Sequence, residues 1–210
     1  MAAPKFKIAL IVGSTRTPRV GPPIAAWISS VLAPTVPSNV ILETVDLADY
    51  PLPLSPHGSI SPAKITTPGV PIPIGAYKDT QIDTWSQKIS PYSAFIFLTP
   101  QYNWSFPGVL KVSLDHLFYE WLGKPALIVS YGGRGGAKAA AALAEVWKGV
   151  RGGEVVGSVE LGIGESMELA QTKGELKVGQ GEIWEKEGKV ASLVEGFGKL
   201  VGVLEEPSKV

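Results

Sequence analysis

The feature that most constrains the fold of this chain is a set of five short apolar runs, each bounded by turn residues. The runs cover 6–12, 40–45, 94–98, 126–129 and 155–161, and their lengths suit parallel strands that are covered on both faces. Apolar residues with helical spacing follow each run, at 24–31, 82–89, 110–121, 143–150 and 190–204. This alternation predicts an α/β three-layer sandwich with a five-stranded parallel sheet.

Length and composition narrow the classes of protein that fit this pattern. A chain of 210 residues with 45% hydrophobic and 18% charged residues suits one globular domain over 1–210. Nineteen basic and nineteen acidic residues cancel, which argues against nucleic-acid binding and against a carrier that docks through a charged face. The stretch 1–7 is too short for the apolar part of a signal peptide. We expect a cytoplasmic protein without nucleic-acid or membrane partners.

The chain contains no cysteine, which removes disulfides, thiolate nucleophiles, iron–sulfur clusters and the usual structural zinc sites. Redox chemistry must therefore come from a bound cofactor, and no metal site is expected. A Ser-His-Asp hydrolase is disfavoured, because the chain has no Gly-x-Ser-x-Gly elbow and His116 stands beside Asp115 on a predicted helix. We interpret His116 as packed or solvated and His57 as a surface-loop residue, with contact to an acceptor as the alternative for His57.

The loop after the first run, 13–21, has the composition of a phosphate site. It reads Gly-Ser-Thr-Arg-Thr-Pro-Arg-Val-Gly and precedes a helix with Pro22 and Pro23 in its first turn. Amides, hydroxyls and the helix dipole favour an anion, and Arg16 or Arg19 can give it a bidentate bond. The loop matches neither an NTPase phosphate loop nor a dinucleotide fingerprint. An ordinary polar turn is the alternative.

The loops after the third and fourth runs have the composition of a pocket for a flat ring. In 99–108, Tyr102, Trp104 and Phe106 can wall a ring while Asn103 bonds to its polar edge. In 130–136, four glycines within five residues let the backbone approach a ligand closely. Core packing of the aromatics and a flexible glycine turn are the alternatives. All three loops would meet outside the carboxyl ends of the strands, where open α/β sheets bind ligands.

With these three loops, the chain resembles the NADPH-dependent FMN reductase family, which includes flavin-dependent quinone reductases and azoreductases. Gly13-Ser14-Thr15-Arg16 is similar to the family's phosphate loop, 99–108 with Leu110-Lys111 and Leu114-Asp115 to its central flavin motif, and 130–133 to its third loop. The resemblance covers 6–160. It implies a flavodoxin-like fold, FMN as cofactor, NADPH or NADH as cosubstrate, and a homodimer with flavin pockets near the subunit contact.

The resemblance also assigns residues by position. The FMN phosphate falls to Ser14, Thr15, Arg16, Arg19 and Val20; the ring to Pro100, Gln101, Tyr102, Asn103 and Trp104; and its other edge to Ser130, Tyr131, Gly132, Gly133 and Gly136. The family commonly has an acidic residue where Gln101 stands and a glycine where Trp104 stands. The surroundings of the ring could therefore be altered or partly covered in this chain.

The implied function is an FMN-dependent NAD(P)H oxidoreductase that reduces quinones, flavins or related acceptors by a ping-pong hydride mechanism. The flavin carries the chemistry, so we assign no catalytic side chain. Arg134 would help to stabilise reduced flavin, and Arg19 and Arg134 are the arginines available to a 2′-phosphate of NADPH. The alternative is a non-catalytic flavoprotein, an electron carrier or a flavin-responsive interaction partner, and Trp104 would favour it by covering the face that nicotinamide needs.

Two segments resist the alternating pattern. The stretch 51–78 carries prolines at 51, 53, 56, 62, 68, 71 and 73, and so long a loop is usually functional or mobile. The stretch 162–181 is rich in glycine and charge, and we interpret it as a solvated excursion before the last helix. We expect 110–121 and parts of 51–78 to contribute to the homodimer contact.

Overall fold

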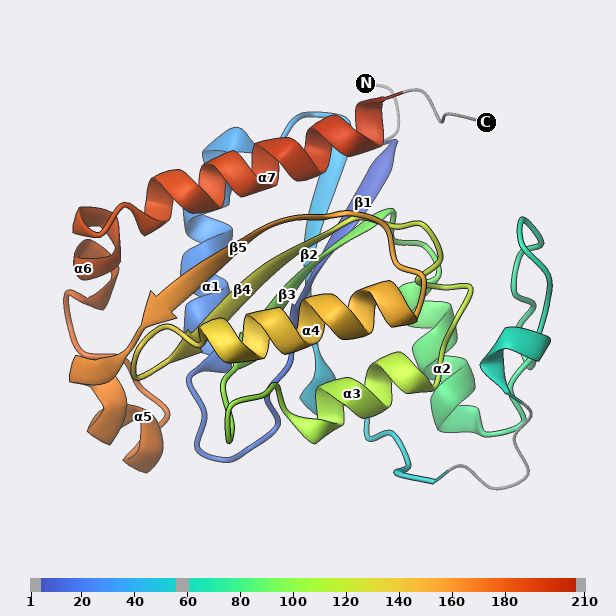
Figure 1. Cartoon of the computed structure of the whole chain (residues 1–210), viewed down its shortest axis with the longest axis horizontal. Helices are drawn as coiled ribbons and strands as arrows, with labels where there is room; N and C mark the ends of the chain where they lie inside the picture. The colour runs from blue at the N-terminus through green and yellow to red at the C-terminus, as the bar shows by residue number, and fades with distance from the viewer. Residues whose placement is uncertain (1–4, 56–60, 207–210) are drawn as a thin grey trace.

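The computed structural model describes residues 5–55 and 61–206 and contains one five-stranded parallel sheet with the order β2-β1-β3-β4-β5 (Figure 1). The strands are β1 (Phe6–Val12), β2 (Val40–Asp46), β3 (Ala94–Pro100), β4 (Ala126–Gly132) and β5 (Val155–Gly162). Each predicted run is a strand, and four of the five strands continue a little past the apolar run. The strand order confirms the flavodoxin-like fold.

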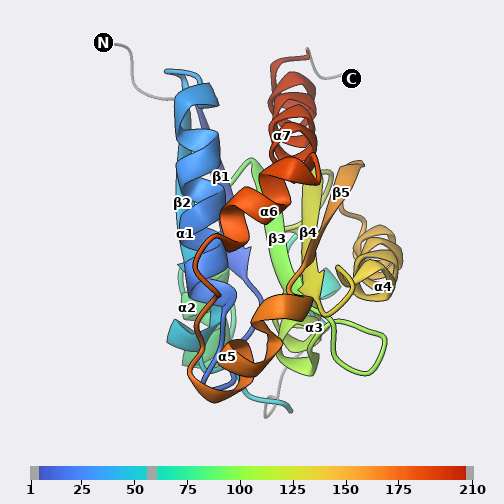
Figure 2. The ribbon, with the colours of Figure 1, turned by 90° about the vertical axis from the view of Figure 1, so that its left-hand side faces the viewer.

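The helices form one layer on each face of the sheet (Figure 2). They are α1 (Gly21–Leu32), α2 (Thr80–Ile89), α3 (Gly108–Asp115), α4 (Ala137–Gly149), α5 (Met167–Thr172), α6 (Gln180–Lys186) and α7 (Lys189–Glu205), with short 3-10 turns at Ala33–Thr35, Leu47–Asp49, Pro62–Lys64 and Gly164–Ser166. α1, α6 and α7 pack on one face, and α2, α3 and α4 on the other. Because both faces are covered, β3 is buried along its whole length.

None of the helices in the described parts of the chain has the length and apolar character that a membrane crossing requires. The cytoplasmic location stays a prediction. The single domain over 1–210 also stays a prediction, because both termini lie outside the described residues.

The helix predicted over 110–121 ends at Asp115, which corrects the sequence interpretation. The apolar spacing continues because Leu117 and Trp121 stay buried on the same face after the helix has ended. The Trp121 ring packs edge-on against Phe95, with 4.9 Å between ring centroids, and its Nε1 donates to Leu114 O at 3.1 Å. The apolar spacing therefore indicated which residues are buried on this face, but not where the helix ends.

A buried carboxylate organises the chain after α3. Glu120 is 1% exposed and accepts hydrogen bonds from Phe118 N at 3.1 Å, Tyr77 Oη at 2.9 Å and Ser86 Oγ at 2.5 Å. Burial and the Glu120 carboxylate raise the pKa of Tyr77. We call Tyr77, Ser86 and Glu120 the Glu120 cluster. Lys124 stands four residues further along, and burial lowers its pKa to about 8.

The segment 162–181 is folded and is not a solvated excursion, which is a second correction. It contains the Gly164–Ser166 turn and α5 and reaches the start of α6. Ser166 Oγ donates to Gln180 Oε1 at 2.6 Å, and both residues are buried. Trp184 Nε1 donates to Gly162 O at 2.7 Å. The composition predicted a solvated segment because it is rich in charged residues, and these lie on the outside. The buried polar contacts could not be read from composition, because they join residues that are distant in sequence.

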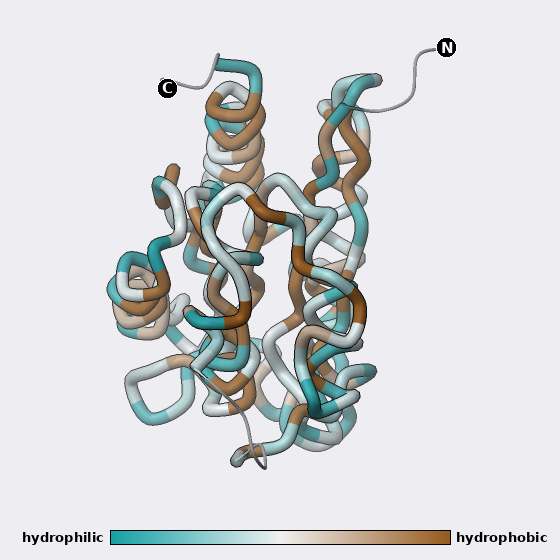
Figure 3. The backbone as a smooth tube through the Cα atoms, turned by 90° about the vertical axis from the view of Figure 1, so that its right-hand side faces the viewer, coloured by the Kyte–Doolittle hydropathy of each residue, from teal (hydrophilic) through white to brown (hydrophobic). Residues whose placement is uncertain are grey.

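Where the structure describes it, the proline-rich segment 51–78 makes hydrogen bonds to the chain that follows α3. His116 is 7% exposed and its Nε2 lies 2.6 Å from Pro53 O, which confirms the packed alternative for this histidine. Tyr119 Oη donates to Ala63 O at 3.1 Å. Figure 3 looks onto this side of the molecule, where hydrophobic and hydrophilic stretches alternate. His57 lies outside the described residues.

Candidate functional site

The loops after β1, β3 and β4 meet at one edge of the sheet, because these strands are neighbours and run parallel. We call this the carboxyl edge, and the loops 13–20, 101–107 and 133–136 the first, second and third loop. They border a cavity of about 470 Å³, the first cavity. Of the residues assigned to the cofactor, those that line it are Arg16, Arg19, Val20, Pro100, Gln101, Tyr102, Tyr131, Gly132 and Gly133.

The first loop leaves a buried hydroxyl without a partner. Ser14 is fully buried, and its Oγ lies near Tyr131 Oη without a hydrogen bond of favourable geometry to any described residue. It lies against Gly21, the first residue of α1, where an added Cβ would collide with Ser14 Oγ. α1 begins without a side-chain cap and with prolines in its first turn, as predicted. A buried hydroxyl beside an uncapped helix N-terminus fits the phosphate end of a cofactor.

One other buried side-chain atom in the described parts of the chain lacks a partner. This atom is Trp147 Nε1, which lies against the backbone of Gly152 just after α4 and away from the carboxyl edge. Trp147 lines neither the first cavity nor the second cavity described below.

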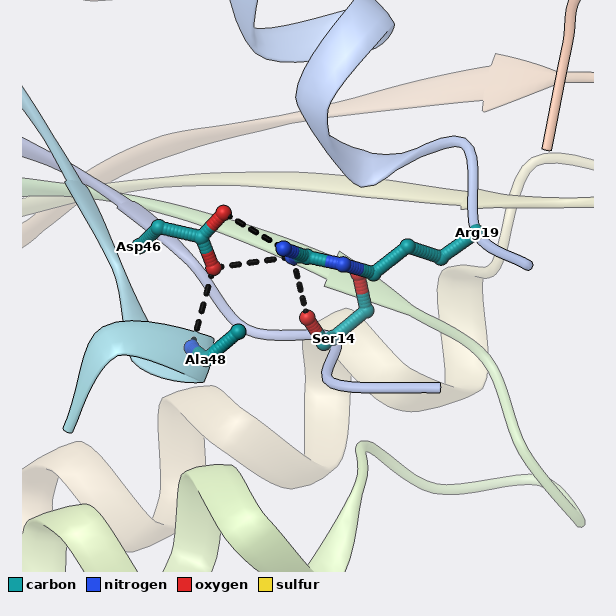
Figure 4. A network of polar contacts seen from close by, with 4 residues as sticks. All are labelled: Ser14, Arg19, Asp46 and Ala48. Carbon is teal, nitrogen blue, oxygen red and sulfur yellow. Dashed lines mark hydrogen bonds and ion pairs between the residues drawn. The ribbon is translucent and has the colours of Figure 1, made fainter. Parts of the chain in front are cut away.

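Arg19 is engaged by the protein itself (Figure 4). Its guanidinium donates to both carboxylate oxygens of Asp46, at 2.8 and 2.7 Å, and to Ser14 O at 2.6 Å. Asp46 also accepts a bond from Ala48 N at 3.0 Å. The hydrogen bond and charge of Asp46 raise the pKa of Arg19. Arg19 borders the cavity, but it is not the spare arginine that the sequence interpretation assumed.

Arg16 joins the first loop to the second. Its guanidinium lies over the Tyr102 ring, 3.7 Å from the ring centroid, a cation–π arrangement. Burial raises the pKa of Tyr102, and burial also raises that of Tyr131. Both phenols therefore stay neutral near pH 7, and the charge that faces the cavity is positive.

The second loop turns Trp104 away from the first cavity. Tyr102 and Ser105 exchange backbone hydrogen bonds of 2.8 and 2.9 Å, and between them Asn103 and Trp104 have φ of 48° and 68°. This is the geometry of a two-residue hairpin that favours Asn-Gly. Trp104 is 71% exposed with the Lys138 ammonium over its ring, and neither turn residue lines the cavity. Of the three aromatics expected to wall a ring, only Tyr102 lines the first cavity, and Phe106 packs in the core.

Gln101 and the third loop shape the other side of the cavity. Gln101 Oε1 accepts bonds from the first-turn amides Lys138 N at 3.1 Å and Ala139 N at 3.3 Å, and so caps α4. At the position where the family commonly has an acidic residue, the side-chain amide of Gln101 therefore acts as a helix cap. Ser130 Oγ donates to Gly135 O at 2.9 Å, and Gly136 has φ of 88°. Ser130 and Gly136 therefore fix the loop, while its neighbours face the cavity.

Sequence reasoning missed one wall of the cavity. Ile163, Met167, Ala170 and Gln171 line it from the segment around α5. Gly174, which follows α5, packs against the first loop. Its φ is 70°, and an added Cβ would lie 2.8 Å from Arg19 N. The spacing of Met167 and Ala170 was the available signal, but the surrounding charge favoured a solvated loop.

A second cavity lies on the other side of the first loop. It measures about 530 Å³ and is lined mostly by apolar residues, namely Thr15, Leu47, Ala48, Tyr50, Pro51, Leu52, Leu54, Gly108, Val109 and Val112. Thr15 faces this second cavity and not the first. Of the assigned residues, Ser14, Thr15, Asn103, Trp104, Ser130 and Gly136 do not line the first cavity.

Comparison with known proteins places this geometry in a family. The family model described as NADPH-dependent FMN reductase matches residues 6–168. An NAD(P)H-dependent FMN reductase of Schizosaccharomyces pombe is 43% identical over 141 residues, which are 67% of this chain and 64% of that protein. Another, from a Nectria species, is 31% identical over 206 residues, 97% of this chain and 99% of that protein.

Solved structures show the same fold. The flavoenzyme NAD(P)H:(acceptor) oxidoreductase FerB of Paracoccus denitrificans has a TM-score of 0.59 and 22% identity, over 92% of this chain and 98% of that one. The family match spans most of the chain and includes all three loops of the carboxyl edge. The chain therefore belongs to the NADPH-dependent FMN reductase family, a family of oxidoreductases.

Proposed function

We propose that this protein is an FMN-dependent NAD(P)H oxidoreductase that reduces quinones, flavins or related acceptors by a ping-pong hydride mechanism. The observation that carries the proposal is the first cavity, where three loops border about 470 Å³ beside the buried, unpartnered Ser14 hydroxyl. The names of the fungal relatives, both NAD(P)H-dependent FMN reductases, support it. FMN, when bound, supplies the hydride chemistry.

The first loop would hold the phosphate of the cofactor. Ser14 Oγ can donate to a phosphate oxygen, and the uncapped N-terminus of α1 favours the negative charge. Arg16 is the arginine of this loop that is not held by a carboxylate in the described structure, and its guanidinium lines the cavity. Pro22 and Pro23 have no N–H, and Ile24 N already donates to Val20 O, so the first turn of α1 offers few amides. The binding of the phosphate therefore rests on one hydroxyl, the backbone amides of the first loop and one guanidinium.

The second and third loops would hold the ring. Pro100, at the end of β3, and Gln101 and Tyr102 of the second loop line the cavity, as do Tyr131 and Gly132, at the end of β4, and Gly133 of the third loop. None of the described residues that line the cavity is Asp, Glu, His or Lys, and the pKa values of Tyr102 and Tyr131 are raised by burial. The chain thus offers position and fixed positive charge, and no group that exchanges protons near pH 7.

The non-catalytic flavoprotein remains the alternative, and Trp104 is the residue that separates the two functions. An indole over the ring face would block nicotinamide and favour a carrier. Trp104 is 71% exposed and lies outside the lining of the first cavity. This supports an enzyme whose ring face is accessible.

The proposal includes a homodimer formed through the face that carries the second cavity. Val109 and Val112 of α3 and Leu52 and Leu54 of the proline-rich segment line that cavity, and Leu54 is 82% exposed. An apolar surface of this kind is typical of subunit contacts. Size-exclusion chromatography with light scattering should give a dimer, and Leu54→Asp should shift it toward a monomer.

The catalytic proposal is tested by anaerobic stopped-flow absorption of the protein reconstituted with FMN. Mixing with NADPH should bleach the flavin band, and later addition of 1,4-benzoquinone should restore it. Gly133→Leu, which places a side chain in the cavity, should abolish FMN binding, whereas Gly198→Leu on the open surface of α7 should not. Bound flavin that NADPH cannot bleach would favour the carrier, and absence of FMN binding would overturn the proposal.

A further inference from the structure

We infer that Arg19 and Asp46 are positioning residues that fix the first loop for the FMN phosphate without binding the phosphate themselves. The inference deepens the proposed function and rests on it, because it concerns how that cavity selects a phosphorylated flavin. Arg19 comes from the end of the first loop and Asp46 from the end of β2 (Figure 4). The sequence interpretation had assigned Arg19 to the phosphate.

The contacts of Arg19 divide its guanidinium between two acceptors. Two bonds of 2.8 and 2.7 Å reach Asp46, a planar pairing with a carboxylate, and one bond of 2.6 Å reaches Ser14 O. The side chains of Arg19 and Asp46 are 18% and 21% exposed, so the pair is largely shielded from water. Three of the five N–H donors of the guanidinium are thus used, including both on Nη1, and its charge is paired with the Asp46 carboxylate.

The bond to Ser14 O has a specific consequence for an anion. A free carbonyl oxygen in the first loop would repel a phosphate, and Arg19 draws this one into a bond inside the protein. The same bond holds the residue whose buried Oγ lies beside Gly21 and the start of α1. Arg19 therefore acts through Ser14, by holding its hydroxyl where the phosphate would bind.

Two further contacts hold the pair in place. Asp46 also accepts from Ala48 N at 3.0 Å, at the start of the Leu47–Asp49 turn. Gly174 packs on the opposite side, where an added Cβ would lie 2.8 and 2.9 Å from Arg19 N and O. The first loop is thus held between the end of β2 and the segment after α5. The positive charge of Arg19 is balanced there by the negative charge of Asp46.

The test measures the phosphate preference of the apo-protein, defined as the Kd of riboflavin divided by the Kd of FMN, by quenching of flavin fluorescence. The decisive variant is the double change Arg19→Met with Asp46→Asn, which keeps the local net charge at zero. The preference should fall about 10-fold, the effect of one misplaced charge-assisted bond. Arg19→Lys, which keeps the charge but cannot span both acceptors, should give a smaller fall. Asp46→Asn alone should also lower it.

Arg151→Met is the matched control, because it removes an exposed arginine just after α4, outside the first cavity, and it should leave the preference unchanged. An unchanged preference in the double variant would overturn the inference. So would a gain in FMN affinity on Asp46→Asn together with a loss on Arg19→Met, the pattern of a direct phosphate ligand. If the double variant does not fold, as judged by circular dichroism, Arg19→Lys and Asp46→Asn decide between the same outcomes. A wild type that binds neither flavin would instead overturn the proposed function.

Discussion

The first loop and the Glu120 cluster each contain a buried polar side chain, and they differ in how completely its hydrogen bonds are made. Glu120 accepts from three donors and is 1% exposed. In the first loop, by contrast, Ser14 Oγ is fully buried and has no partner among the described residues. The comparison teaches that completed polar contacts build the fold, whereas an incomplete one beside a cavity marks a ligand site. Variants of the two regions should therefore affect different measurements.

The largest expected effect is on stability, at the Glu120 cluster. Glu120→Ala leaves the buried Tyr77 Oη and Ser86 Oγ and the partly buried Phe118 N without an acceptor, and should lower the free energy of unfolding by about 3 kcal/mol. Urea denaturation measures it. Glu145→Ala, which removes an exposed partner of Lys148, should cost at most about 0.5 kcal/mol. A loss as small as that of the control would show that the cluster does not hold the fold.

The next effect is the pH dependence that Lys124 imposes. Its Nζ donates to Ser90 O at 3.0 Å, and burial lowers its pKa to about 8. Below pH 8 the amine is charged in both states and its burial cost is constant. From pH 8 to about 10 the folded state loses the proton first, so stability should rise by about 2 kcal/mol.

Above that range the sign reverses, because burial raises the pKa of Tyr77 and that of Tyr92, the latter to about 12. The unfolded state then ionises these phenols first and stability falls. Urea denaturation of the wild type and of Lys124→Met across this range isolates the lysine. The variant should be more stable at pH 7 and lack the rise, and parallel curves would contradict the assignment.

Ser14 should affect FMN binding and not stability, the opposite of the stability effect expected at Glu120. Ser14→Ala should weaken FMN binding about 10-fold, because one bond to a charged phosphate is lost. The apo-protein should be as stable as the wild type or slightly more so, since the hydroxyl has no partner to lose. Fluorescence titration and urea denaturation check the two parts. A destabilised apo-protein with unchanged FMN affinity would remove the distinction between the regions.

The sequence predicted the five strands and the meeting of the three loops, because strands buried on both faces leave apolar runs that other elements rarely produce. It did not predict that Arg19 is bound by Asp46, which is 27 residues away and is charged in a way that any surface residue could be. The α5 wall was missed because its polar contacts, such as Ser166 with Gln180, are buried while its charges are outside. Composition reports the kind of side chain and not the direction in which it points.

The direction of the Trp104 side chain is the clearest example of what composition cannot predict. Substitutions of Trp104 should have the smallest of the predicted effects. Its φ of 68° suits glycine, the residue that the family commonly has there. Trp104→Gly should be more stable than Trp104→Ala by about 1 kcal/mol in urea denaturation, since both lack the indole and its contact with Lys138 and only alanine retains the left-handed strain. FMN affinity should be unchanged in both, because Trp104 does not line the first cavity. Equal stability of the two variants would mean that residue 104 does not have a left-handed backbone conformation in solution. A loss of FMN affinity in both variants would mean that the indole covers the ring, and it would favour the non-catalytic carrier.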